Sequence, residues 1–168
     1  MLYFIQKIFK GIDRMDRNTI EDRDTALSLK LFVVLSRALE AIEKKTADNI
    51  KNYGMNLTEF AVLELLFNKG DQPIQKIGQK ILIASSSITY VVDKLEKKKY
   101  VERVACLTDR RVTYAAITDK GKAFMEELFP KHQELMKDIM STLGIEEKEI
   151  MIEQIKKLGL FAKEYQTE

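Results

Sequence analysis

Residues 74–118 place two closely spaced helical segments before two strand-like segments, and this order constrains the fold more than any other feature. Helical spacing of apolar residues predicts a short helix over IQKIGQKIL and a longer one over ASSSITYVVDKLEKKK. YVERVACL and VTYAAIT then have the β-branched and aromatic composition of strands, and the polar TDRR separates them. The stretch predicts a helix-turn-helix followed by a β-hairpin with a charged tip.

A long helix and a capped helix precede this region. From Asp24 to Tyr53, apolar residues recur at helical spacing without an intervening proline or glycine. Asn56, with Glu59 three residues later, has the spacing of a capping box and predicts the start of a second helix, which Gly70 ends.

Two more helices follow the hairpin. Thr118 caps a long helix that Pro130 is expected to bend, and residues 145–163 form the last helix. The middle of the chain is too small to cover the apolar faces of the terminal helices, so we expect a homodimer. The predicted divisions are an N-terminal extension over residues 1–23, a helical dimerisation region over residues 24–55 and 119–168, and a winged helix-turn-helix over residues 56–118.

Composition indicates a cytoplasmic protein that does not associate with membranes. A chain of 168 residues with 45% hydrophobic residues can bury a core, and no apolar stretch approaches the ~20 residues of a transmembrane helix. The apolar run at residues 2–5 is too short for a signal peptide. Residues 1–14 are either a dispensable extension or an additional amphipathic helix that packs on the dimer.

Basic residues concentrate in the middle third. The net charge is +2, yet residues 76–111 hold nine basic and four acidic residues. This distribution is typical of a nucleic-acid-binding module, although solvated surface charge also produces it.

The residues needed for catalysis are scarce. The chain has one histidine, one cysteine and no Gly-x-Gly-x-x-Gly loop, so we expect no enzyme activity, no cofactor and no metal. His132 is expected on a helix surface.

The ordered motifs resemble the MarR family of bacterial transcription regulators. They are IGQKILIASSSITYVVDKLEKKKYVER, Asp109-x-Arg111, and Ile117-Thr118-x-x-Gly121. The tract from Gly54 to Thr118 is most similar to the branch that represses quinone and hydroquinone detoxification genes. The resemblance implies a mainly α fold with a small β wing: a winged helix-turn-helix with long terminal dimerisation helices.

The resemblance also implies a palindromic double-stranded DNA operator. Hydroxyl groups on the first turns of the recognition helix are expected to contact bases or phosphates, and they belong to Ser85, Ser86, Ser87, Thr89 and Tyr90. Lys94 and the lysines at 97–99 are expected to meet phosphate or solvent. Arg110 and Arg111 at the wing tip suit a narrow minor groove, with Asp109 orienting Arg111; the alternative for Asp109 and Arg111 is an ordinary surface ion pair.

The chain departs from the family pattern after the recognition helix. Lys99 stands where relatives have glycine, so either it adopts a left-handed conformation at a cost of about 1 kcal/mol, or the turn is built differently. Leu82 replaces a turn glycine, and the wing holds the apolar Ala105, Cys106 and Leu107.

Relatives imply release of DNA by a small aromatic or electrophilic effector. A cleft is expected at the junction of the dimer helices and the winged helix, near Phe32, Tyr53, Phe60 and Phe67, although a filled aromatic core would use the same residues. Cys106 is a candidate redox or electrophile sensor if nearby arginines lower its pKa, or else a small apolar strand residue. The rival function for the whole chain is a protein-interaction module that does not bind DNA.

Overall fold

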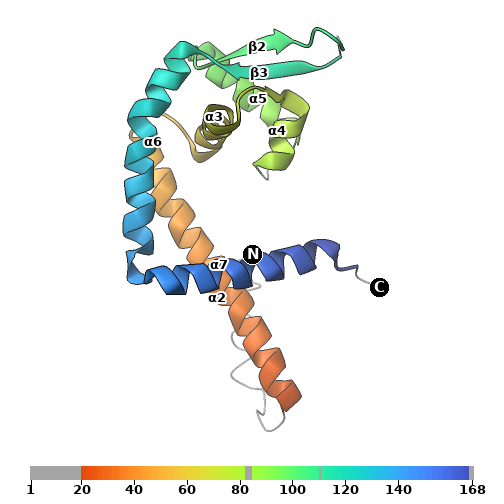
Figure 1. Ribbon diagram of the computed structural model, residues 1–168, viewed down its shortest axis with the longest axis vertical. Helices are drawn as coiled ribbons and strands as arrows, with labels where there is room; N and C mark the ends of the chain where they lie inside the picture. The colour runs from red at the N-terminus through yellow and green to blue at the C-terminus, as the bar shows by residue number, and fades with distance from the viewer. Residues whose placement is uncertain (1–19, 82–84, 110, 167–168) are drawn as a thin grey trace.

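The computed structural model describes residues 20–81, 85–109 and 111–166, with residues 85–87 described by their backbone alone. The chain is mainly helical with a small antiparallel sheet (Figure 1), as the sequence predicts. The elements are α2 (Ile20–Lys51), α3 (Leu57–Lys69), β1 (Gln72–Pro73), α4 (Ile74–Lys80), α5 (Ser85–Lys97), β2 (Val101–Ala105), β3 (Thr113–Ile117), α6 (Asp119–Ile139), the 3-10 helix η1 (Met140–Thr142) and α7 (Ile145–Glu164). The alternatives for residues 1–14 and the turn position Leu82 lie outside the described residues.

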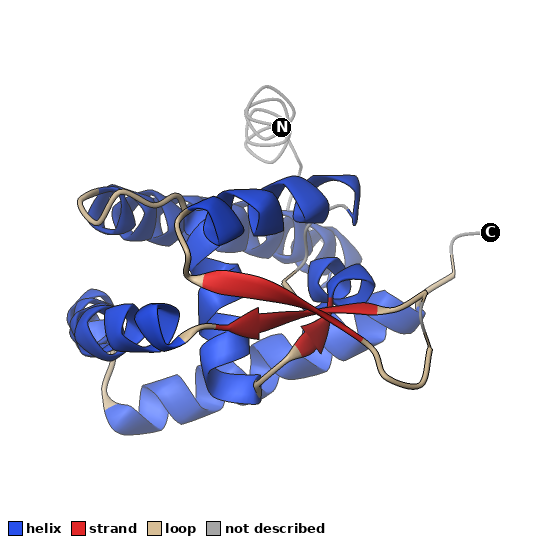
Figure 2. Cartoon of the chain, turned by 90° about the horizontal axis from the view of Figure 1, so that it is seen from above, coloured by secondary structure: helices blue, strands red, loops and turns tan. Residues whose placement is uncertain are grey.

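The predicted hairpin is present, and a third strand joins it. β2 pairs with β3 along its whole length, and β3 also pairs with β1, which gives the order β1-β3-β2 (Figure 2). β1 lies at the sheet edge. Pro73 is tolerated there because no further strand needs the backbone N–H that proline lacks. The sheet holds the hairpin against the helix-turn-helix, as a wing requires.

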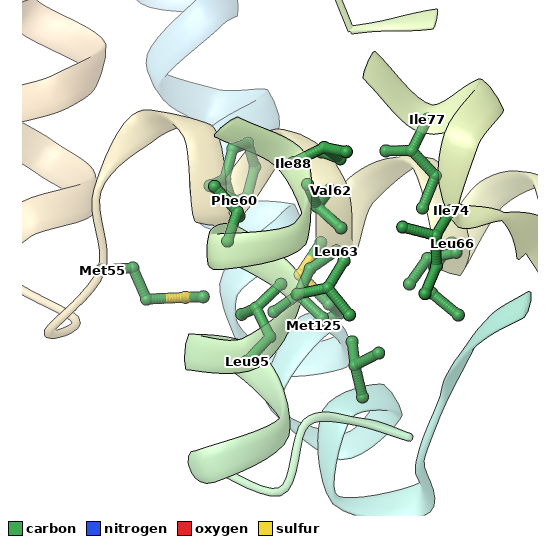
Figure 3. Packing of buried hydrophobic residues seen from close by; sticks show 14 of the residues in the cluster. Met55, Phe60, Val62, Leu63, Leu66, Ile74, Ile77, Ile88, Leu95 and Met125 are labelled. Atoms are coloured by element: carbon green, nitrogen blue, oxygen red, sulfur yellow. The ribbon is translucent and has the colours of Figure 1, made fainter. Parts of the chain in front are cut away.

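One hydrophobic core joins the helix-turn-helix to the sheet and to α6. Helix α3 packs against α5, α6 and β3, and α5 packs against α4 and β2. Figure 3 shows this packing, in which the labelled side chains from α3, α4, α5 and α6 converge. This core therefore holds one side of α5 rigidly.

Local capping signals determine the ends of the helices. Asn56 Oδ1 accepts from the Glu59 amide at 2.8 Å, and Glu59 Oε2 accepts from the Asn56 amide at 3.1 Å, which confirms the capping box. Thr118 Oγ1 accepts from the Gly121 amide at 3.1 Å and caps α6. Lys99 has a φ of 62°, so the first of the two alternatives for this position is confirmed. Pro130 lies inside α6, which continues to Ile139.

Helices α2 and α7 leave apolar side chains uncovered. Helix α7 crosses α2 away from the sheet (Figure 1), and within the described chain α7 has no buried residue. The exposed large apolar residues of these two helices include Leu27, Leu31, Leu39, Ile150, Ile155 and Phe161. No helix in the described ranges is long and apolar enough to cross a membrane.

Candidate nucleic-acid interface

Helix α5 has one buried and one outward face. Ile88, Val92 and Leu95 are buried against the core, which fixes the rotation of the helix. Tyr90 is 61% exposed on the other side, and Thr89 is also exposed. By helical spacing, positions 86, 90, 94 and 97 share this outward face. The side chains of Ser85, Ser86 and Ser87 lie outside the described residues, so the structure tests only where their backbone lies.

Tyr90 and Lys94 form one unit on the outward face. The Lys94 ammonium lies 4.6 Å from the centroid of the Tyr90 ring, within the range of a cation–π contact. The Tyr90 side chain raises the pKa of Lys94 above its ordinary value, so the ammonium stays charged. An aromatic hydroxyl and a cation are therefore presented together.

The lysines at the end of α5 have different roles. Lys98 Nζ donates to Glu59 Oε2 and to the Gly54 carbonyl oxygen, both at 2.9 Å. This corrects the expectation that Lys98 meets phosphate or solvent, because its ammonium joins α5 to the start of α3. Lys97 is exposed and has no ion pair within the described ranges.

Arg103 ties the wing to α5. From β2, its guanidinium donates to Asp93 Oδ1 at 2.5 Å and also to the Glu96 carboxylate. Both carboxylates belong to α5, so the hairpin and the helix are linked by a forked, charge-assisted contact. The sequence alone does not predict this role for Arg103.

At the wing tip, Asp109 holds Arg111. Asp109 Oδ1 accepts from the Arg111 backbone N at 3.0 Å and from its Nε at 3.1 Å, and Oδ2 accepts from Nη2 at 3.3 Å. These hydrogen bonds from Arg111 lower the pKa of Asp109. The Arg111 side chain is 91% exposed, so the pair faces solvent. Arg110 lies outside the described residues, and a minor-groove role for either arginine stays a prediction.

Cys106 follows β2 near the wing tip and is partly buried. Its Sγ lies 3.3 Å from Thr108 Oγ1. The Thr108 hydroxyl, followed by the backbone N–H groups of Thr108 and Asp109, lowers the pKa of the thiol. The expected cause was a nearby arginine, but Arg103 instead binds the acidic residues of α5.

The four aromatic residues assigned to an effector cleft have different surroundings. Phe60 is 2% exposed in the core, and Phe67 packs against Phe129 with ring centroids 6.0 Å apart. Tyr53 lies 5.2 Å from the Lys131 ammonium, and Phe32 is half-exposed on α2. Phe60 and Phe67 fit the filled-core alternative, and ligand binding by the set stays a prediction.

His132 is half-buried on α6 rather than fully exposed. Its ring lies 4.8 Å from that of Phe60 and 6.4 Å from that of Phe129, and its Nδ1 is buried without a hydrogen-bond partner in the described chain. Burial lowers its pKa. No group of three or more histidine, cysteine, aspartate or glutamate residues within the described ranges has the arrangement of a metal site.

Comparison with known proteins identifies the family. The MarR family model matches residues 55–113. The HTH-type transcriptional regulator MhqR of Bacillus subtilis is 53% identical over 141 residues, which cover 84% of this chain and 97% of the relative. The chain belongs to the MarR family. It is therefore a DNA-binding transcriptional regulator and not an enzyme.

Solved structures of DNA-binding proteins share the fold. Sco3205 of Streptomyces coelicolor, a MarR family regulator solved in complex with DNA, matches with a TM-score of 0.72 and 19% identity over 84% of this chain and 90% of that one. BpsR of Bordetella bronchiseptica, whose DNA binding is regulated by 6-hydroxynicotinic acid, matches with a TM-score of 0.68 and 20% identity over 75% of this chain and 90% of that one.

Proposed function

We propose that the chain is a homodimeric repressor that binds a palindromic operator with one α5 helix in each half-site and is released by a small aromatic or electrophilic compound. The observation that carries this proposal is the two-sided α5. Its apolar side is fixed in the core, whereas Tyr90 and Lys94 are presented outward in the turns that follow a hydroxyl-rich first turn. A helix held in this way inserts into a major groove as a rigid unit.

The dimer is supported by the uncovered faces of α2 and α7. Together they border an apolar hollow of about 450 Å³ lined by Leu31, Leu35, Gln154, Ile155, Lys157, Leu158 and Phe161. Burying one large apolar side chain contributes ~1.5–3 kcal/mol, so several of them on two helices are sufficient to hold a second copy. In this proposal residues 24–55 and 119–168 dimerise and residues 56–118 bind DNA.

Sedimentation velocity tests the dimer. The wild type is expected to sediment as a dimer at micromolar concentration, and Leu31→Glu with Phe161→Glu is expected to weaken the association. A folded wild-type monomer at that concentration would contradict the proposal.

The base contacts are assigned to the first half of α5. Ser86, Ser87 and Tyr90 lie on its first turns, where recognition helices meet base edges, while Lys94 serves phosphate and therefore carries no base information. At the wing, Arg110 and Arg111 enter the minor groove beside each half-site. The two half-sites are about one helical turn apart, roughly 34–36 Å between centres.

Fluorescence anisotropy with duplexes from the DNA upstream of the chain's own gene tests this assignment. Ser86→Ala and Tyr90→Ala are expected to change the preferred sequence, whereas Lys94→Ala weakens binding to all sequences. If every variant weakens binding to all sequences by the same factor, the assignment of base contacts is wrong. Failure of the wild type to bind any of these duplexes would contradict the proposed operator and favour the alternative of a protein-interaction module.

The effector is the second part of the proposal. The regulation of BpsR by 6-hydroxynicotinic acid supports a hydroxylated aromatic ligand for this fold, and the resemblance to the quinone and hydroquinone branch names the first compounds to test. A ligand that prefers a dimer with wrongly spaced α5 helices shifts the population away from DNA.

Release of bound DNA by quinones, hydroquinones and salicylate-like acids is compared in the wild type and in Cys106→Ser. Loss of the response in the variant assigns it to the thiol. Retention assigns it to a non-covalent cleft, which Phe32→Ala and Tyr53→Ala then locate. No release by any compound at millimolar concentration would contradict the effector part and leave DNA binding standing.

A further inference from the structure

A hollow lined by lysines lies where the C-terminal end of α5 meets the end of α2 and the start of α3. Its volume is about 500 Å³. The cationic lining comes from two helices: Lys51 is the last residue of α2, and Lys94, Lys97 and Lys98 belong to α5 or directly follow it. Its character differs from that of the hollow between α2 and α7, which is apolar.

The hollow keeps positive charge that the protein does not neutralise. Glu59 is the acidic residue of the lining, and its carboxylate accepts from Lys98. Lys51 and Lys97 are exposed and form no ion pair within the described ranges. A concave site with several ammonium groups attracts a compact anion such as a phosphate.

The hollow continues the outward face of α5. Lys94 lines it and at the same time lies over the Tyr90 ring, and Lys97 follows on the same side of the helix. DNA lying along this face places its bases at the first turns of α5 and its backbone at the last turn.

We propose that this hollow holds a phosphate of the operator backbone between Lys51 and Lys97. The inference rests on the proposed DNA-binding function and extends it, because it brings α2, a helix assigned to the dimer, into direct contact with DNA. Binding of a phosphate by Lys51 and Lys97 together depends on the distance between α2 and α5. The contact is therefore strongest when the dimer holds α2 and α5 in one arrangement.

The test measures operator affinity of the full chain by fluorescence anisotropy from 50 to 200 mM salt. Removing one lysine that pairs with a phosphate is expected to reduce the slope of log affinity against log salt by about 0.9 in magnitude. Lys51→Met keeps the aliphatic part of the side chain and is expected to reduce the slope and to weaken binding to operator and unrelated duplexes alike. In a dimer both copies change, so the reduction approaches twice that value. Lys51→Arg restores the slope.

Lys45→Met is the matched control, because Lys45 is an exposed lysine of α2 outside the hollow and should leave the slope unchanged. A wild type that binds no duplex contradicts the proposed function itself. A wild type that binds, together with a Lys51→Met variant of unchanged slope, overturns the phosphate site alone. A separate outcome also overturns the site: millimolar inorganic phosphate raises the melting temperature of the wild type but not of Lys51→Met, and the salt slope of Lys51→Met for DNA equals that of the wild type. The hollow would then bind a free anion and not a DNA phosphate.

Discussion

The Lys98 ammonium donates to the buried Glu59 carboxylate at 2.9 Å, and this contact joins the recognition helix to the first turn of α3. Glu59 is 3% exposed, whereas about a third of the Lys98 side chain is exposed. The same carboxylate oxygen completes the capping box by accepting from the Asn56 amide. One buried oxygen therefore fixes both the start of α3 and the end of α5.

Removing Lys98 should destabilise the chain because Glu59 would remain buried without its cation. We expect Lys98→Met to lower the free energy of unfolding by about 1–3 kcal/mol, since Lys98 is partly exposed and the full effect of breaking a buried pair is larger. In the Glu59→Gln background the same substitution should cost less. Urea unfolding of the four proteins measures the difference.

The control for this cycle is Lys122→Met, which removes an exposed pair with Asp119 and should change stability by no more than ~1 kcal/mol. An equal cost of Lys98→Met in both backgrounds would show that Glu59 and Lys98 are not coupled.

Lys99 is a second stability prediction. Its φ of 62° lies in the left-handed region, where a side chain costs about 1 kcal/mol relative to glycine. Lys99→Gly should therefore raise the free energy of unfolding by about that amount. Lys99→Ala keeps the strained conformation and should not stabilise, which separates the backbone effect from loss of the charge. A similar gain in both variants would point to charge instead.

The features that the sequence predicted correctly are encoded locally. The capping box of Asn56 and Glu59 spans one helical turn and appears in the structure with the predicted partner. The cap of Thr118 is equally local, and the structure shows that it accepts from the Gly121 amide. The family glycine position made a left-handed conformation one of two alternatives for Lys99, and the structure has this conformation. The periodic apolar residues of α5 predicted its buried face for the same reason.

The features that sequence reasoning missed depend on contacts distant in the chain. Lys98 and Glu59 are 39 residues apart, and a run of three lysines gives no sign of which one pairs with a buried carboxylate. β1 has two residues, too few for a strand period, and it forms because β3 offers a free edge. The contact of His132 with Phe60 gave no local signal, because it forms only where α6 packs on α3. Phe129, in contrast, is a local neighbour three residues before His132 on the same helix.

Gly121 lies where α6 begins against the turn before β2. A Cβ atom at this position would be 2.2 Å from the Tyr100 carbonyl oxygen and 2.8 Å from Ile117 Cγ1. The Tyr100 oxygen accepts from the Thr118 amide, so it has no freedom to move away. Gly121→Ala is therefore expected to lower the free energy of unfolding by ~1–3 kcal/mol despite the better helix propensity of alanine.

Thermal unfolding measures this decrease, with Lys122→Ala on the neighbouring position as the control that alters α6 without a clash. If Gly121→Ala melted at or above the wild-type temperature, the junction would be looser than the distances imply.

His132 predicts how stability depends on pH. Its pKa in the folded chain is lowered from the ordinary 6.5 by burial, against a smaller opposing effect of the Glu64 carboxylate. The unfolded chain therefore binds more protons than the folded chain between the lowered pKa and 6.5. The contribution of neutral His132 to stability is complete above this range and is lost as the pH falls through it.

We therefore expect the wild type to melt at a lower temperature at pH 5.5 than at pH 7.5, and His132→Phe to lose much less over the same interval, because a phenyl ring keeps the contact with Phe60 and cannot be protonated. The chain has one histidine, so few other groups titrate there. Glu64→Gln removes the carboxylate that favours the imidazolium and should enlarge the loss. If the melting temperature falls equally in the wild type and in His132→Phe, the acid sensitivity arises elsewhere. A smaller fall in His132→Phe assigns it to the imidazole ring that contacts Phe60 and Phe129.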